Sequence, residues 1–148
     1  MTTLFQDVAR FHAVFGLPVA RTSGGGQRPE LPSQELMQYR INFLKEELAE
    51  LIDACAERNL VEAADAIADL VWVALGTAHY FGLPFDQVWE EVRRSNMEKR
   101  PWRDGDPIKP RAQHMSNMSP EIVKPIGWRG PDIDAVLDHE AQWYGTKV

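Results

Sequence analysis

Carboxylate side chains recur at helical spacing in two stretches of an otherwise apolar part of the sequence. The first stretch carries Glu46, Glu47 and Glu50, and the second carries Asp65 and Asp69. Residues three or four apart share one face of a helix, so each stretch forms a single acidic stripe. Carboxylates that lie close together raise one another's pKa and resist joint ionisation unless a cation compensates their charge. Because the donors are all oxygens, with no Cys or His at the same helical spacing, the expected cation is Mg²⁺ or Mn²⁺. Mg²⁺ usually completes its shell with water and substrate phosphates, which indicates nucleotide chemistry.

Two long helices must position these stripes. A 3.6-residue apolar repeat predicts one helix over residues 33–57 and another over residues 60–81, which ends before Gly82. A connection this short requires the two helices to form an antiparallel hairpin. Folding the hairpin about residue 58 places position 47 opposite position 69. The two acidic stripes therefore meet at the same height.

A plainer interpretation exists for each carboxylate taken singly, because Glu and Asp on helices mostly form solvated faces. Glu62 also stands three residues after Asn59, which predicts a helix cap in the manner of a capping box. Asp53 and Glu57 are interpreted as solvated side chains. The metal site rests on the combination of two stripes, matched in height, on helices whose other positions are apolar.

The remaining segments complete an all-α fold. Residues 3–15 form a short amphipathic helix, Asp86 caps a fourth helix, and a short last helix is expected near Ile133–Gln142. No stretch carries a strong strand pattern. We expect a four-helix core in residues 1–100 and an irregular C-terminal extension in residues 101–148, which packs on the core or on a neighbouring subunit.

The helix over residues 60–81 is apolar nearly all round, so it is predicted to be the central and most buried one. Cys55, the single cysteine, is interpreted as a small buried hydrophobe. A small bundle has difficulty hiding a helix that is apolar all round. A homodimer or homotetramer is therefore expected.

Composition and charge exclude several classes of protein. The 148 residues suit one domain, and 44% hydrophobic with 26% charged residues is typical of a globular chain. The net charge of −6 argues against a nucleic-acid partner. No apolar run reaches the ~20 residues of a membrane span, and the N-terminus lacks a signal-peptide pattern. An intracellular protein without a membrane partner is expected.

Three motifs make the chain resemble the all-α nucleoside triphosphate pyrophosphohydrolases, the MazG-like and phosphoribosyl-ATP-pyrophosphohydrolase-like group with many phage-encoded members. "EELAE" (46–50) matches the family's E-E-x-x-E motif, "DAIADLVW" (65–72) is similar to its acidic second motif, and "RRSNMEK" (93–99) is similar to the Asn/Lys motif of its last core helix. The usual second motif is E-x-x-D, but Ala66 stands three residues before Asp69. Asp65 is the candidate replacement, which leaves one or two metal ions open.

The resemblance implies cleavage between the α and β phosphates, and it assigns roles to residues of this chain. The catalytic candidates are Glu46, which would orient or deprotonate the attacking water, and Glu47. The metal-ligand candidates are Glu47, Glu50, Asp69 and Asp65, with Mg²⁺ or Mn²⁺ as the cofactor. The substrate-binding candidates are Lys99, Asn96, Arg93, Arg94, Lys45, Asn42 and Trp72. For one of the two arginines, an exposed basic last turn that complements the helix dipole is an equal alternative.

The predicted function is hydrolysis of a (deoxy)nucleoside triphosphate to its monophosphate and pyrophosphate, in the cytoplasm, or in the host cytoplasm for a phage-encoded protein. A purine deoxynucleotide such as dGTP is the expected substrate, because some phage relatives act on dGTP. The alternatives are a dUTP- or pyrimidine-directed enzyme and a phosphoribosyl-ATP pyrophosphohydrolase. From another class, the alternative is a helical oligomer that binds a cation or a basic partner without catalysis.

Overall fold

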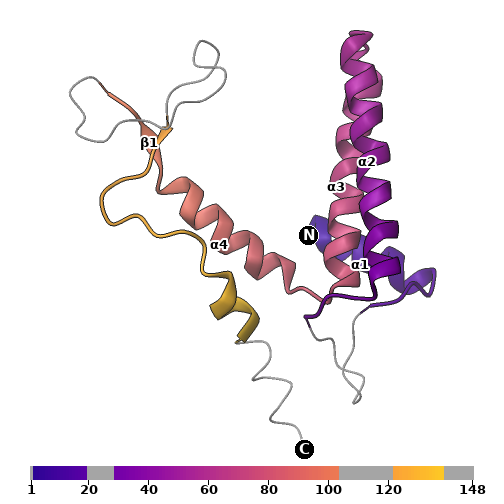
Figure 1. The fold of residues 1–148 in the computed structure, drawn as a ribbon, viewed down its shortest axis with the longest axis horizontal. Coiled ribbons are helices and arrows are strands. Elements are labelled where there is room, and N and C mark those ends of the chain that lie inside the picture. Colours follow the sequence, from indigo (N-terminus) through magenta and orange to yellow (C-terminus); the bar gives the residue numbers. More distant parts are fainter. Residues whose placement is uncertain (1, 20–28, 104–121, 139–148) are drawn as a thin grey trace, which may run out of the picture. The chain divides into compact units, whose positions relative to one another are not determined.

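The computed structural model describes residues 2–19, 29–103 and 122–138, and its elements are almost all helical (Figure 1). The four long helices are α1 (Leu4–Val14), α2 (Gln34–Ala56), α3 (Leu60–Tyr80) and α4 (Phe85–Met97). The all-α prediction is confirmed. The last predicted helix is helical over residues 133–138, and its remainder lies outside the described residues.

Local capping residues fix the ends of the α2–α3 hairpin. Ser33 Oγ accepts a hydrogen bond from the backbone N–H of Leu36, and Asn59 Oδ1 accepts from the N–H groups of Val61 and Glu62. Between the helices, Arg58 adopts a φ of 56°. This left-handed residue lets the chain reverse within the turn, so α2 and α3 lie side by side along their length (Figure 1).

Helix α1 packs against α3, at the end of the hairpin where α2 begins and α3 ends (Figure 1). Its start is fixed by a capping box between Thr3 and Gln6. Its aromatic side chains then meet those of α3: the ring centroids of Phe11 and Trp72 are 5.4 Å apart, and those of His12 and Tyr80 are 4.9 Å apart. These edge-to-face contacts tie α1 to the hairpin.

The prediction that the helix over residues 60–81 is central and most buried is confirmed in that α3 has more buried residues than the other helices and packs against both α1 and α2, whereas the predicted burial of Cys55 is wrong. The C-terminal half of α3 is largely buried, but Leu60 and Ile67 in its first half are 82% and 52% exposed. Cys55 on α2 is exposed as well. The reason is geometric, because the far part of the hairpin has only the other helix of the pair to pack against, and α1 covers just its near end.

The described residues divide into two compact units: one comprises residues 2–86 together with residues 137–138, and the other lies within Gln87–Val136. In the second unit, β1 (Arg100–Pro101) pairs antiparallel with β2 (Ile122–Val123), a small ribbon that the sequence did not predict. Trp128 Nε1 donates a hydrogen bond to the carbonyl oxygen of Ser95, 2.7 Å away, which fixes the segment after β2 against α4. Asp86 lies within the first turn of α4 and not at its cap.

Among the residues that the structure describes, no helix combines the length and the apolar character that crossing a membrane would require.

Candidate active site

The five predicted carboxylates of the hairpin form one electrostatic cluster. Glu47 is half-buried, and the other four side chains are exposed. Burial raises the pKa of the Glu47 carboxyl, and the neighbouring carboxylates raise it further in the order Glu50, Asp69, Glu46 and Asp65. Each of the other four thus lies close enough to oppose the ionisation of Glu47. The structure therefore brings the two stripes together at one level of the hairpin.

The structure bears on the position at which the second motif departs from the family's usual pattern, because the residue found there is buried. Ala66, which stands where the family has glutamate, is buried with 4% of its surface exposed. Asp65 is exposed and contributes to the raised pKa of Glu47, so its carboxylate belongs to the cluster. Glu62 is not among the groups that shift this pKa, and its backbone N–H is bound by the Asn59 cap.

A cavity of about 360 Å³ opens beside this cluster and is enclosed by the first three helices. Glu47 and Asp69 contribute to its lining, one from each helix of the hairpin. Most of the remaining wall is aromatic or apolar, and it comes from α1, α2, α3 and the residues that follow α1: Phe11, His12, Leu17, Tyr39, Arg40, Phe43, Trp72, Val73, Gly76 and Tyr80. Acidic oxygen donors and flat apolar surfaces thus share one cavity, which suits a ligand that brings a cation at one end and a ring at the other.

Trp72 is the predicted substrate-binding residue that lines this cavity. Its side chain is 41% exposed and meets the ring of Phe11 edge to face. Asn42 and Lys45 lie on the exposed surface of α2 and do not line the cavity.

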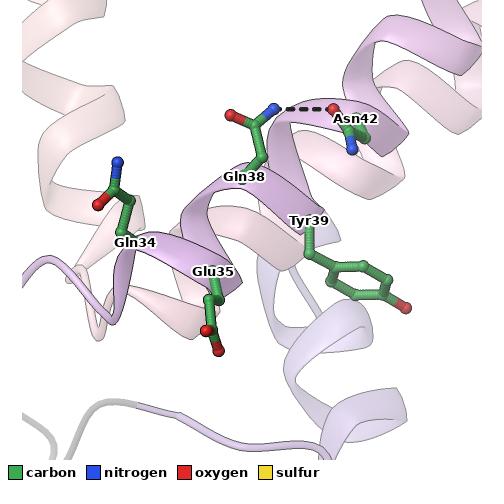
Figure 2. A pocket seen from close by; sticks show the side chains of 5 residues that line it. All are labelled: Gln34, Glu35, Gln38, Tyr39 and Asn42. Atoms are coloured by element: carbon green, nitrogen blue, oxygen red, sulfur yellow. Dashed lines mark hydrogen bonds between the residues drawn. The ribbon is translucent and has the colours of Figure 1, made fainter.

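Asn42 instead lines a separate, polar hollow of about 500 Å³, formed entirely by side chains of α2 (Figure 2). Its Oδ1 accepts a hydrogen bond from Gln38 Nε2 at 2.9 Å, so this amide pair is engaged within the helix (Figure 2). Tyr39 lines both this hollow and the cavity beside the carboxylates.

Two of the predicted phosphate ligands, both arginines of α4, are engaged in ion pairs within the second unit. Arg93 pairs with Glu90 one turn away. Arg94 binds Glu91 and Glu98, and it also donates a hydrogen bond to the carbonyl oxygen of Gly130 at 3.2 Å. Glu91 and Glu98 raise the pKa of Arg94 above its ordinary value, and the hydrogen bond to Gly130 ties α4 to the segment around residue 130.

Lys99 and Asn96 present a different environment at the end of the same helix. Lys99 Nζ donates a hydrogen bond to Asn96 Oδ1 and lies 5.6 Å from the centroid of the Trp128 ring. Lys124 Nζ lies 4.0 Å from the same centroid. Within the described part of the chain neither lysine forms an ion pair with a carboxylate, so an anion can approach both ammonium groups.

Among the described residues, no three His, Cys, Asp or Glu side chains converge closely enough to hold a metal ion. The carboxylate cluster is therefore defined by its helices and its shared charge, and not by a formed coordination shell.

Sequence reasoning missed several cavity residues, above all His12 and Gly76. His12 is 3% exposed, and its Nδ1 has no hydrogen-bond partner among the described residues. Gly76 lies close to side chains of α1 and α2. A Cβ there would lie 3.0 Å from Arg40 Nη2 and 3.1 Å from His12 Nε2.

Comparison with known proteins gives this geometry a context. The sequence model of the family described as phosphoribosyl-ATP pyrophosphohydrolase matches residues 8–96, which is more than half of the chain. A curated viral protein, the "Uncharacterized protein L479" of Acanthamoeba polyphaga mimivirus, is 34% identical over 84 residues. That match covers 57% of this chain and 33% of the viral protein, so the chain spans about a third of the length of that relative.

Proposed function

The chain belongs to the phosphoribosyl-ATP pyrophosphohydrolase family, within the MazG-like all-α superfamily, and we propose that it hydrolyses a nucleoside triphosphate to its monophosphate and pyrophosphate. Pyrophosphohydrolase activity is the activity of this family. One observation supports the finer proposal most directly: Glu47, in the midst of four other carboxylates, lines the same cavity as Trp72 and Tyr80. The acidic end suits a cation with phosphates, and the aromatic end suits a base.

We propose Mg²⁺ or Mn²⁺ as the cofactor, held by Glu47, Glu50, Asp69 and Asp65. The donors fit, because they are all carboxylate oxygens and because their mutual repulsion, seen in the raised pKa of Glu47, is what a divalent cation relieves. Glutamate and aspartate side chains change rotamer readily at an exposed site, so they can converge on an ion. When bound, such an ion neutralises phosphate charge and lowers the pKa of a bound water.

Other residues of the chain are proposed for proton transfer and for binding the phosphates. Glu46, on the flank of the stripe, accepts the proton of the attacking water at its carboxylate, with Glu47 as its catalytic partner. The candidates for a positive charge and a hydrogen bond to phosphates stay Lys99 and Asn96, with Arg93 and Lys45 as further candidates. We assign Arg94 to bracing α4, because its guanidinium is bound by two carboxylates and a carbonyl oxygen.

The proposed substrate is a purine deoxynucleotide such as dGTP. The family description favours a second candidate, phosphoribosyl-ATP, whose pyrophosphate leaves by the same cleavage. A pyrimidine substrate such as dUTP is the third candidate, after dGTP and phosphoribosyl-ATP. The alternative that is not an enzyme is a helical oligomer that binds a cation without catalysis.

We further propose that the protein acts as a homodimer or homotetramer in the cytoplasm. Large apolar side chains lie exposed on the hairpin of the single chain, including Leu48, Ile52, Ile67 and Val71 at 43–60% exposure. A second copy of the chain is the partner that would cover them.

A nucleotide panel tests the function. Purified protein is incubated with Mg²⁺ and each common nucleoside and deoxynucleoside triphosphate, with phosphoribosyl-ATP included, and pyrophosphate is measured apart from orthophosphate. The proposal expects pyrophosphate from at least one triphosphate. Release of pyrophosphate from phosphoribosyl-ATP alone would establish the second candidate. No pyrophosphate from any substrate, together with a metal-dependent rise in melting temperature, would establish the non-catalytic alternative.

A further inference from the structure

The cavity beside the carboxylates has two chemically different ends. Glu47 and Arg40 both line it from α2, seven residues apart, which is two helical turns or about 10 Å along the axis. On α3 the same spacing separates Asp69 from Gly76. Arg40 is not among the groups that shift the pKa of Glu47, so its charge does not neutralise the acidic end. The cavity therefore carries negative charge at one end and a guanidinium at the other.

Arg40 is held in a fixed orientation. It is 8% exposed, its Nε donates a hydrogen bond to Thr77 Oγ1 at 3.2 Å, and its Nη2 donates one to the carbonyl oxygen of Val73 at 3.0 Å. The guanidinium carbon lies 5.0 Å from the centroid of the Tyr80 ring and 5.4 Å from that of Phe43. The two hydrogen bonds use two of the five N–H groups of a guanidinium.

The charge of Arg40 has no acidic counterpart within the described part of the chain. A buried cation without a paired anion is costly unless acceptor atoms satisfy its donors. Its neighbour His12 adds no second charge near neutral pH, because burial, His79 and Arg40 lower the His12 pKa to about 4. Within the described part of the chain, three of the five N–H groups of Arg40 thus form no hydrogen bond.

Gly76 leaves room for the guanidinium of Arg40 and the ring of His12 beside α3. A Cβ at this position would lie 3.0 Å from Arg40 Nη2 and 3.1 Å from His12 Nε2, which is tighter than ordinary contact. Arg40 would have to move. The guanidinium of Arg40, whose N–H groups form a planar fork, therefore takes its position because Gly76 has no side chain.

We propose that Arg40 is the residue that determines base specificity, and that it selects guanine by donating two hydrogen bonds to the O6 and N7 atoms. This proposal rests on the proposed function, which places the phosphates at the carboxylate end. Guanine presents two adjacent acceptors on that edge, whereas adenine presents the N7 acceptor beside an amino donor. A planar guanidinium fork matches the first pattern and conflicts with the second. Phe43, Trp72 and Tyr80 give the base apolar ring surfaces.

Base analogues test the two hydrogen bonds separately. The value of kcat/KM is measured for dGTP, for 7-deaza-dGTP, which lacks the N7 acceptor, for dITP, which keeps O6 and N7, and for dATP. We expect dITP to equal dGTP within a few-fold, and 7-deaza-dGTP and dATP to fall by on the order of tenfold or more. Equal rates on dGTP, 7-deaza-dGTP and dATP, or a preference for dCTP, would overturn the assignment.

Two variants connect this preference to Arg40. Arg40→Lys keeps the charge but loses the planar fork, and Gly76→Ala displaces the fork while it replaces a helical glycine by a better helix former. Both are expected to lower kcat/KM for dGTP by about tenfold or more and to leave that for dATP within a few-fold. Arg10→Lys, on the exposed face of α1, is the matched control and should keep the preference. If circular dichroism shows that Arg40→Lys does not fold, the kcat/KM values of Gly76→Ala for dGTP and dATP test the assignment instead.

Direct binding separates this proposal from the function on which it rests. Calorimetry measures the affinities of wild type and Arg40→Lys for dGMP, 7-deaza-dGMP and dAMP. If no triphosphate is hydrolysed but wild type prefers dGMP and Arg40→Lys does not, the proposed function fails and the base assignment stands. If triphosphates are hydrolysed and Arg40→Lys keeps the guanine preference, the function stands and the base assignment is overturned.

Discussion

Glu47 and Asp69 face one cavity from opposite helices of the hairpin, and the carboxylate of Asp69 helps to raise the pKa of Glu47. Each residue is supported by its own helix, and the short turn at Arg58 fixes the level at which the two meet. This pairing connects the fold with the proposed chemistry, because the proposed cation would relieve the mutual repulsion of the two carboxylates.

Asp69→Asn is expected to lower kcat/KM by at least about a hundredfold, because it removes one of the proposed ligands of the cation. The melting temperature without metal should stay constant or rise, since a repulsive charge is lost. Glu62→Gln on the same helix is the control and should keep full activity. Equal activity of the two variants would remove Asp69 from the site.

Mg²⁺ is expected to raise the melting temperature of the wild-type protein, and chelation by EDTA should reverse the rise. A ligand present at about 100 times its dissociation constant stabilises the folded state by roughly 2.7 kcal/mol. Glu50→Gln should lose most of this response, whereas the exposed Glu57→Gln on the same helix should keep it. A metal response that survives Glu50→Gln would show that the ion binds elsewhere.

The hairpin and its caps could be predicted because their causes are local. Asn59 precedes an apolar repeat, and its side chain caps the helix that follows. Counting back from residue 58 placed Glu47 opposite Asp69 because both helices are regular. The replacement of the family's glutamate by Asp65 also agrees with the electrostatic cluster, although its role as a ligand stays a prediction.

The aromatic end of the cavity could not be predicted from local patterns. It depends on α1 packing against α3, which places His12 near Arg40 and Gly76 although these residues are far apart in the sequence. A helical period also cannot tell whether Ile67 faces the chain's own core or a second copy. The hydrogen bond from Arg94 to the carbonyl oxygen of Gly130 joins two segments whose relative position no helical repeat specifies.

The stability of the protein is expected to fall between pH 6.5 and pH 4 because of His12. Its pKa is about 4 in the folded protein and 6.5 ordinarily, so the unfolded chain takes up the proton first as the pH falls. The full contribution is present above pH 6.5, and its loss approaches about 3 kcal/mol near pH 4. Denaturant unfolding of wild type and His12→Gln measures it. The same slope in both proteins would contradict the assignment, because the carboxylates titrate alike in each.

Arg58→Gly is expected to stabilise the protein by about 1 kcal/mol, because a φ of 56° costs a side chain energy that glycine avoids. Glu57→Gly, one position earlier at a φ of −78°, is the matched control and should destabilise it. Urea unfolding at neutral pH measures both. A stability loss in Arg58→Gly would show that the turn needs this arginine for another reason.

Sedimentation equilibrium is expected to give two or four times the 16.8 kDa mass of one chain. Ile52→Glu should shift the equilibrium toward single chains, because it places a charge on the exposed apolar face of α2. Asp53→Lys, on an adjacent exposed position, is the control. A monomeric wild-type protein would contradict the proposed assembly.

The central claim is that the carboxylate cluster hydrolyses a nucleoside triphosphate between its α and β phosphates. Phosphorus NMR of a reaction of wild-type protein with dGTP and Mg²⁺ tests it most directly, with Glu47→Gln examined in parallel. The expected result is dGMP and pyrophosphate in equal amounts with wild type, and less than about a hundredth of that rate with Glu47→Gln. Formation of dGDP and orthophosphate, or an undiminished rate in the variant, would contradict the claim.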